Sequence, residues 1–415
     1  MSTVPAISEA SPHSGHIRSV RLYHFRTYQD HCFQISGPRV MIAGPNGSGK
    51  TNLLEALSLF TVGTGLRGAK LRTMQSAHHP APWAVHLDWT GTGDDALSLG
   101  TAMDGEALAT GKERRLLHIH RENAPLHALS DHLNIVWHVP KMDRLFGEGT
   151  TERRRFWDRV VYGFYPDHLT HLRLYESARR ERSALFERQI TSAAWHRGLE
   201  SVLAEKGVAI AAARLDVARI LNTCALNIPF RYAPVSCAGW IEDALIAGQR
   251  ALSVEEAYRQ HLETLRHLGK TEGPHQSVLS AFDEQKNVDA ALASTGEQKL
   301  FVLSLQLRIA HLLAARRRTL LLLDDVTSHL DPRHCQTLAQ ALNAGPFVTW
   351  LSTVNPENLG ALEGERIDLG LGWVGSRSIP LLWRGVRRSL TGWFCVAPTT
   401  PPLRGTPPEE GNKDH

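Results

Sequence analysis

The stretch GPNGSGKTNLLEAL, residues 44–57, contains Gly44 and Gly49 five positions apart, followed directly by Lys50 and Thr51. With this spacing the glycines let backbone N–H groups curl around a phosphate. Lys50 supplies a charge for β- and γ-phosphate oxygens, and Thr51 supplies a hydroxyl for Mg²⁺. The apolar run VMIA precedes the loop and the amphipathic TNLLEALSLF follows it, so a glycine-rich turn without function is disfavoured. The stretch predicts a phosphate-binding loop between a strand and a helix.

A second element, TLLLLDDVTSHLD at residues 319–331, is an apolar run that ends in two acids. Four consecutive leucines indicate a buried strand. Asp324 at its end is placed to hold the Mg²⁺ shell of a P-loop nucleotidase, and Asp325 to orient or deprotonate water. A strand with an ordinary capped turn is the alternative, which the presence of a phosphate loop disfavours.

Between these two elements, ASTGEQKLFVLSLQLRIA at residues 293–310 begins with Ser294 and Gly296 and continues as an amphipathic helix. A serine hydroxyl and free N–H groups at a helix N-terminus form an anion site. An ordinary helix cap is the alternative, and the position shortly before the Asp-Asp strand favours the anion site.

Composition sets broader limits. The chain has 415 residues, 42% hydrophobic and 21% charged, which predicts a packed core in two or three domains. A net charge of +4 permits nucleic-acid binding without arguing for it. Five scattered cysteines, no secretory signal and no apolar stretch long enough for a bilayer lead us to expect a soluble cytoplasmic protein without a membrane partner. His118 and His120 lack companion ligands, so we expect no metal there.

Local patterns predict the secondary structure. Alternating apolar and polar residues indicate strands within 17–43 and 84–120. Helical spacing with few breakers predicts helices at 150–164, 168–190, 195–222 and 253–268. No heptad pattern is sustained, so a long coiled-coil arm is not expected.

The same patterns divide the chain into five segments. We expect a disordered tail at 1–15, the N-terminal part of an α/β lobe at 16–139 and an inserted helical lobe at 140–290. The C-terminal part of the α/β lobe follows at 291–375, and a Pro-rich tail without fixed structure at 376–415.

The order of the three motifs resembles the ABC-type ATPase class, and further segments resemble the bacterial RecF family. These segments are LYHFRTYQDHCFQI, DRLFGEGTTERRRFWDR, TEGPHQSVL, STGEQK and LLLDDVTSHLD. Together they extend over roughly residues 17–360. The resemblance implies an α/β fold: an ABC-type P-loop ATPase head of mixed β layers and helices, with an inserted, mainly α-helical lobe.

The resemblance also implies roles for individual residues. The ATP-binding residues would be Gly44, Pro45, Asn46, Gly47, Ser48, Gly49, Lys50, Thr51 and Asn52, joined in trans by Ser294, Gly296 and Gln298 of a second copy. Thr51 and Asp324 would hold Mg²⁺, and Asp325 with Lys50 would be catalytic. Arg26 would lie near the nucleotide. No glutamine stands near Lys141, and Ser352 or Thr353 occupies the region of the transporters' switch histidine, which is consistent with slow turnover.

Basic side chains recur at helical spacing in the expected helical lobe. Arg153, Arg154, Arg179 and Arg180 are the candidates for a positive stripe that binds DNA phosphates without reading sequence. From the residues alone, a solvated face paired with local glutamates is the better interpretation. The RecF resemblance favours DNA.

Taken with its residues, the resemblance predicts an ATP-dependent DNA-binding protein of recombinational repair and replication restart. An ATP-induced homodimer would bind DNA near single-strand gaps and help RecA loading with RecO and RecR, and slow hydrolysis of ATP would reset it. The alternatives are an SMC or Rad50-type chromosome ATPase, a transporter-type ABC subunit, and a scaffold that has lost hydrolysis. The first needs long heptad arms, and the second needs Asp-Glu, a Q-loop glutamine and a switch histidine, which this sequence lacks.

Overall fold

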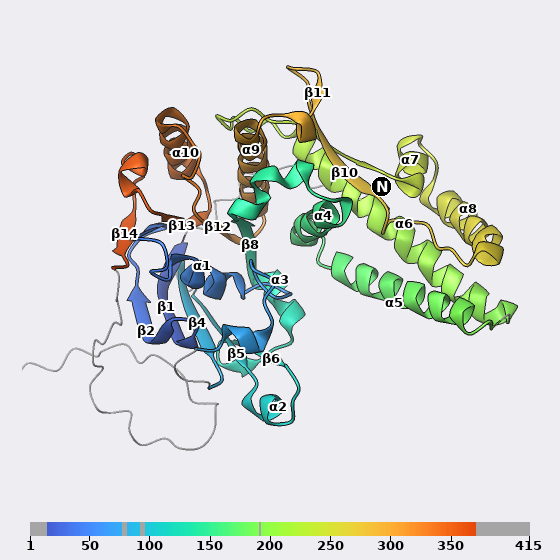
Figure 1. The fold of residues 1–415 in the computed structure, drawn as a ribbon, viewed down its shortest axis with the longest axis horizontal. Coiled ribbons are helices and arrows are strands. Elements are labelled where there is room, and N and C mark those ends of the chain that lie inside the picture. Colours follow the sequence, from blue (N-terminus) through green and yellow to red (C-terminus); the bar gives the residue numbers. More distant parts are fainter. Residues whose placement is uncertain (1–14, 77–80, 92–95, 191, 371–415) are drawn as a thin grey trace, which may run out of the picture. The chain divides into compact units, whose positions relative to one another are not determined.

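The computed structural model of the chain describes residues 15–370 except 77–80, 92–95 and 191 (Figure 1). These residues fall within one compact unit, Met1–Val374. The predicted tails at 1–15 and 376–415 lie outside the described residues, apart from Gly15, which begins the first strand.

A parallel sheet of five strands carries the phosphate loop. Its order is β14-β3-β13-β12-β8, with the strands β14 (Glu365–Asp368), β3 (Arg39–Ala43), β13 (Val348–Thr353), β12 (Arg318–Leu323) and β8 (Leu133–His138). Leu320 and Leu322 of β12 enter one hydrophobic core, while Leu321 and Leu323 enter another. The four-leucine run is therefore buried on both faces of the sheet, as expected for a central parallel strand.

An antiparallel sheet of six strands packs against one face of the parallel sheet. Its order is β2-β1-β4-β5-β6-β7, with the strands β2 (Tyr28–Gln34), β1 (Gly15–Phe25), β4 (Ala84–Gly91), β5 (Leu97–Met103), β6 (Arg115–Ile119) and β7 (Glu122–Asn123). Helix α1 (Lys50–Ser58) buries Leu53 and Leu57 in the core shared by the two sheets. The other face of the parallel sheet is covered by α9 (Thr295–Ala314) and α10 (Pro332–Ala344). We call the two sheets with α1, α9 and α10 the sheet lobe.

A helical lobe is inserted between β8 and α9. Its helices are α4 (Thr150–Phe164), α5 (His168–Glu187), α6 (Ala193–Thr223), α7 (Trp240–Ile246) and α8 (Ala251–Thr264), accompanied by the antiparallel strands β9 (Val235–Ala238), β10 (Val278–Asp283) and β11 (Val288–Asp289). Helices α5, α6 and α8 pack side by side (Figure 1) around a core of their own. Phe156 and Trp157 of α4 enter the α9 core instead, which joins the two lobes.

Short helical segments complete the described chain: η1 (Leu71–Met74), α2 (Gly105–Ala109), η2 (Leu126–Ala128), α3 (Leu129–His132), η3 (Pro140–Gly147), η4 (Leu265–Leu268), η5 (Ala290–Leu292) and η6 (Pro356–Leu359). The predicted α/β class with mixed sheets and an inserted helical lobe is confirmed. Each of the four predicted helices is present: the first has the predicted bounds, and the other three have ends shifted by up to three residues, the last closing as η4.

A buried ion pair and its hydrogen bonds link four segments of the helical lobe. Asp158 of α4 accepts from Arg214 Nε at 2.8 Å and Nη2 at 2.9 Å, and its Oδ1 lies 2.9 Å from His168 Nε2. Arg214 also donates to the carbonyl oxygen of Pro274 at 2.6 Å. Burial raises the pKa of Asp158, but hydrogen bonds from His168 and the charge of Arg214 outweigh it and lower that pKa. Two segments of the RecF resemblance, around residues 158 and 274, are therefore joined by this contact.

Within the described ranges, no helix has the combination of length and apolar character that crossing a bilayer requires. The same residues contain no cluster of three potential metal ligands among His, Cys, Asp and Glu.

Candidate nucleotide site

The loop after β3 has a backbone that requires glycine. Gly44, Gly47 and Gly49 have φ values of 155°, 83° and 99°. A Cβ on Gly44 would lie 2.2 Å from the carbonyl oxygen of Leu369, and one on Gly49 would lie 3.0 Å from the hydroxyl of Tyr28. The left-handed backbone disfavours a side chain at all three positions, and at Gly44 and Gly49 space is also lacking. The glycines predicted from the sequence therefore shape the loop.

Lys50 begins α1 and folds back over the loop. Its Nζ donates to the carbonyl oxygens of Gly44 at 2.7 Å and Pro45 at 2.8 Å. Burial lowers the pKa of Lys50, and the nearby charges of Asp325 and Asp324 partly oppose that effect. The loop thus holds a cation whose two acceptors are neutral carbonyls, and phosphate oxygens are stronger acceptors for the same N–H groups.

The carboxyl ends of β12 and β13 bring acids and hydroxyls to this cation. Asp324 Oδ1 accepts from Thr51 Oγ1 at 2.9 Å and from Ser352 Oγ at 2.7 Å. In the described chain, Asp324 Oδ2 has no hydrogen-bond partner. Carboxylate and hydroxyl oxygens are the ligands that Mg²⁺ prefers. The donor set at Thr51 and Asp324 therefore fits a magnesium ion beside a bound phosphate.

Asp325, the residue after Asp324, is held in a strained backbone conformation. Its φ is 46°, in the left-handed region that a non-glycine residue rarely adopts. Its backbone N–H donates to Ser352 Oγ at 2.8 Å, and its Oδ2 accepts from Ser328 Oγ at 2.6 Å. Ser352 thus contacts both acids, an arrangement that the sequence did not reveal because the residue lies on a different strand.

A cavity of about 270 Å³ lies between the loop and the two acids. Its lining residues are Asn46, Gly47, Gly49, Lys50, Thr51, Asn52, Arg67, Pro140, Asp324, Asp325 and Ser352. The structure therefore brings the phosphate loop, both acids and the start of η3, just after β8, around one space. The assignment of individual residues to ATP and Mg²⁺ stays a prediction.

Arg67 is a pocket residue that the sequence interpretation missed. Its Nη1 donates to Asn52 Oδ1 at 3.0 Å and lies 3.2 Å from Glu55 Oε2. Glu55 is fully buried and also pairs with Arg26, at 2.7 Å. Arg26 does not line the cavity, but through Glu55 it supports Arg67, which does. The available signal was an arginine in the glycine-rich segment GTGLRGAK, which begins at Gly63, shortly after the phosphate-loop helix ends at Ser58.

The Ser-x-Gly element, which begins with Ser294 and Gly296 and which we call the signature, lies outside this cavity. Ser294 caps α9: its hydroxyl accepts from the Glu297 backbone N–H, and Glu297 Oε2 accepts from Ser294 N at 3.1 Å. Hydrogen bonds from Lys286 and Ser294 lower the pKa of Glu297 to about 2. Neither Ser294 nor Gly296 lines the nucleotide cavity of its own chain. Their predicted role in trans therefore stays a prediction, with a preorganised cap available for it.

Gln298 is placed differently from the other predicted residues of the element. Its Nε2 donates to the carbonyl oxygens of Ala291 at 3.0 Å and Ala293 at 2.9 Å. Both amide hydrogens are therefore engaged in fixing the segment before α9. The predicted contact of Gln298 with ATP stays a prediction that would require these bonds to change.

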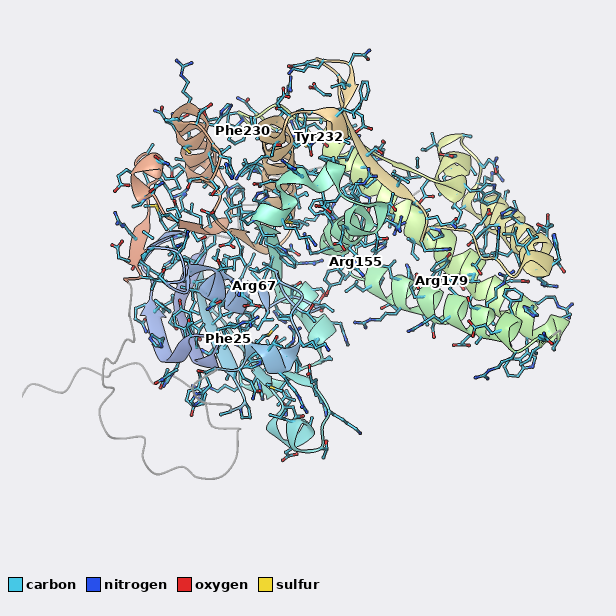
Figure 2. All side chains as sticks on the ribbon, in the orientation of Figure 1. Phe25, Arg67, Arg155, Arg179, Phe230 and Tyr232 are labelled. Carbon is cyan, nitrogen blue, oxygen red and sulfur yellow. The ribbon has the colours of Figure 1, made fainter. Side chains whose placement is uncertain are left out.

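The predicted DNA-binding arginines divide into two kinds. Arg153 Nη1 donates to the carbonyl oxygen of Leu279 at 2.8 Å, and Arg154 Nη1 to that of Ser277 at 3.0 Å. Arg179 pairs with Glu176 on α5 at 2.8 Å, and Arg180 Nε donates to the Glu176 carbonyl oxygen (Figure 2 labels Arg179). The first two arginines therefore anchor α4 to the start of β10 and the residue before it, whereas the last two stand on the surface of α5.

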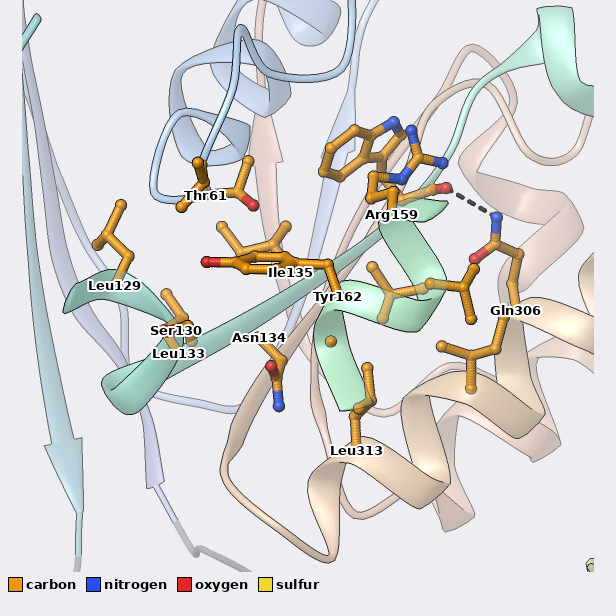
Figure 3. Close-up of a pocket in the computed structure, with 16 residues that line it drawn as sticks. Thr61, Leu129, Ser130, Leu133, Asn134, Ile135, Arg159, Tyr162, Gln306 and Leu313 are labelled. Carbon is orange, nitrogen blue, oxygen red and sulfur yellow. Dashed lines mark hydrogen bonds between the residues drawn. The ribbon is translucent and has the colours of Figure 1, made fainter. Parts of the chain in front are cut away.

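A second cavity lies where the two lobes meet, apart from the cavity at the phosphate loop (Figure 3). It lies beside the start of β8, and Tyr162 and Leu313 are among its lining residues. Gln306 Nε2 donates to the Trp137 carbonyl oxygen at 2.9 Å, and the Arg159 guanidinium lies 3.9 Å from the Trp137 ring centroid. Its free space, about 30 Å³, holds one or two waters. It is too small for a second nucleotide.

Comparisons with known proteins give a consistent result. The model of the AAA domain family matches residues 19–80. DNA replication and repair protein RecF of Brucella abortus (strain 2308) is 36% identical over 335 residues, which cover 78% of this chain and 86% of that protein. The RecF protein of Caulobacter vibrioides is 33% identical over 385 residues, covering 87% and 98%.

Solved structures agree on the fold. The recombination mediator protein RecF with ATP, from the RecFOR pathway, superposes with a TM-score of 0.72 at 18% identity. The match covers 86% of this chain and 98% of that one. At this identity the likeness concerns the fold alone, and it extends over both the sheet lobe and the helical lobe.

Proposed function

Because the chain belongs to the RecF family of DNA replication and repair proteins, we propose that two copies of it close around ATP and bind DNA as a dimer. The chain is a RecF-like, ATP-binding DNA repair protein. The finer proposal is that Mg²⁺ sits at Thr51 and Asp324, that Asp325 activates water, and that slow hydrolysis reopens the dimer in the cytoplasm. RecO and RecR are the proposed protein partners, with RecA loading as the outcome.

One observation supports the dimer most directly. The cavity lined by Lys50 and Asp325 is complete on the phosphate-loop side, yet Ser294 and Gly296 of the same chain do not line it. A signature cap that serves the same reaction must then come from a second copy, through a two-fold interface. ATP held between two chains favours the dimer by mass action.

This proposal is tested by complementation. Ser294→Arg places a bulky cation where the signature would meet the γ-phosphate, and Lys50→Ala removes the cation of the loop. Each variant alone should neither form the ATP dimer nor hydrolyse ATP. A mixed dimer has one site with both changes and one with neither, so mixing should restore up to half of the parent rate. Light scattering with and without ATP and duplex DNA, alongside phosphate release, gives the two readouts.

The opposite result is equally clear. If the Ser294→Arg variant still dimerised with ATP, or if a strictly monomeric form hydrolysed ATP at the parent rate, one chain would complete its own site. An SMC-type assembly with a long coiled-coil arm is not favoured, since α6, the longest described helix, has 31 residues and packs along α5 and α8.

DNA contact is proposed for the exposed arginines of α5. Arg173 and Arg180 line an open hollow of about 400 Å³ with Glu176, Leu169 and Leu172. Positions seven residues apart lie on one side of a helix, about 10 Å apart along its axis. Arg179 precedes Arg180 on α5 and pairs with Glu176. Two cations on one side of a helix can both face a DNA phosphate backbone.

The double variant Arg173→Ala, Arg180→Ala, which removes the two exposed arginines of the hollow, should weaken duplex binding and lower the slope of log K against log salt by about two, because each lost phosphate contact removes about 0.9. ATP binding should not change. The matched control is Arg153→Ala, Arg154→Ala, which removes donors to backbone carbonyls and should instead lower the melting temperature. If the Arg153→Ala, Arg154→Ala control folds and has the lower slope of log K against log salt, while the α5 variant keeps the parent slope, the DNA contact belongs to α4.

A further inference from the structure

Lys299 is a buried cation on the signature helix that the proposed function has not used. It lies five residues after Ser294 on α9 and is 1% exposed. Its Nζ donates to the carbonyl oxygen of Ser328 at 2.6 Å and pairs with Asp143 Oδ2 at 3.2 Å. Burying an ammonium group is costly unless partners are fixed around it. Lys299 therefore holds two other segments against α9.

The first of these segments carries the proposed water-activating acid. Ser328 Oγ donates to Asp325 Oδ2 at 2.6 Å, and Ser328 N donates to the Asp325 carbonyl oxygen at 3.2 Å. Lys299 thus reaches Asp325 through one residue: it bonds to the Ser328 carbonyl oxygen, and the Ser328 hydroxyl bonds to the Asp325 carboxylate. The left-handed φ of Asp325 is a conformation that the surrounding contacts must impose.

The second segment leads to the other wall of the nucleotide cavity. Asp143 Oδ1 lies 2.8 Å from His138 Nε2, and His138 ends β8 two residues before Pro140, which lines the cavity. Hydrogen bonding and charge from His138 and Lys299 outweigh burial and lower the pKa of Asp143, so its carboxylate stays charged beside Lys299. Two segments that border the cavity are thereby tied to one point on α9.

We infer that Lys299 is a positioning residue that couples the two ATP sites of the dimer. The inference rests on the proposed function. In that dimer, Asp325 acts on the ATP held by its own chain, while Ser294 acts on the other ATP. Ser294 and Lys299 stand about 7.5 Å apart along the axis of one helix, whose first turn is fixed by the capping box. A shift of the Asp325 turn at one site is therefore transmitted to the signature serine at the other.

The experiment uses two complementary chains, so that activity comes from mixed dimers alone. The signature donor carries Lys50→Ala and keeps its Ser294; the loop donor carries Ser294→Arg and keeps its Lys50. Their single intact site combines the loop and Asp325 of the loop donor with the signature of the signature donor. Lys299→Met is then added to one donor or the other, and kcat and KM for ATP are measured. Lys112→Met, an exposed lysine before β6, is the matched control.

Coupling predicts that Lys299→Met lowers kcat about tenfold in either donor, with KM little changed, because it loosens Asp325 in one and Ser294 in the other. If kcat falls only when Lys299→Met is in the loop donor, Lys299 is a local support of Asp325. If kcat falls only in the signature donor, or in neither, Lys299 does not position Asp325. Each of these outcomes overturns the coupling. An inactive parental pair overturns the shared site itself, which distinguishes the two failures.

Two further variants separate positioning from folding. Ser328→Ala cuts the link to the Asp325 carboxylate without touching the buried ion pair, and it should lower kcat in the loop donor only. Asp143→Asn keeps the shape of the second anchor and removes its charge, so it replaces Lys299→Met if that variant fails to fold by circular dichroism. A kcat unchanged by Ser328→Ala in the loop donor would overturn the path through Ser328.

Discussion

Lys50→Ala is expected to weaken ATP binding about a hundredfold and to reduce hydrolysis below detection. The Lys50 ammonium lies over the loop with only the carbonyl oxygens of Gly44 and Pro45 as acceptors, so a bound phosphate would capture its N–H groups. Two charge-assisted hydrogen bonds lost at ~1.5 kcal/mol each correspond to roughly 3 kcal/mol. Titration with a fluorescent ATP analogue and a phosphate-release assay measure the two effects.

Lys70→Ala is the control for this variant, since Lys70 is exposed and no described residue accepts a hydrogen bond from its side chain. Thermal unfolding without nucleotide should show little change in either variant. Nucleotide affinity and turnover both at the parent level in Lys50→Ala would refute the assignment of the cavity to ATP phosphates.

The nucleotide site was predictable where its residues are neighbours in the sequence. The loop from Gly44 to Thr51 is one local structure, and its glycines are required by backbone angles that the spacing already implied. Asp324 was predictable because a buried strand run ends at it. These features depend on local conformation, which the sequence encodes directly.

The remaining site residues depend on contacts between distant segments. Arg67 reaches the cavity because Glu55 of α1 accepts from it, and Ser352 reaches both acids because β13 lies beside β12. Neither pairing leaves a periodic signal along the chain. The sheet order, which places β13 between β3 and β12, was likewise not part of the sequence prediction.

The arginine cluster on α4 shows the limit of charge patterns. Arg153 and Arg154 share helical spacing with a solvated stripe, but their guanidiniums donate to carbonyl oxygens of the segment 277–279. A guanidinium carries five N–H donors, and backbone carbonyls and phosphates both accept from them. Sequence spacing indicates which side chains share a face and leaves open what lies opposite that face.

Asp325→Asn is expected to preserve ATP binding and to slow hydrolysis between a hundredfold and ten-thousandfold, the usual range for a lost general base. The amide keeps the size of the side chain and can still accept from Ser328 Oγ, so the turn after β12 should hold its shape. It cannot take a proton from water. Because hydrolysis is the proposed step that opens the dimer, the variant should remain dimeric on DNA after excess ATP is removed.

Single-turnover hydrolysis and the lifetime of the complex on immobilised duplex measure these effects separately. Asp331→Asn is the matched control: Asp331 caps α10, and asparagine is an equally good N-cap, so neither rate nor lifetime should change. Unchanged hydrolysis in Asp325→Asn would require another group to activate water. Slow hydrolysis together with a short-lived complex would instead separate dimer opening from the chemical step.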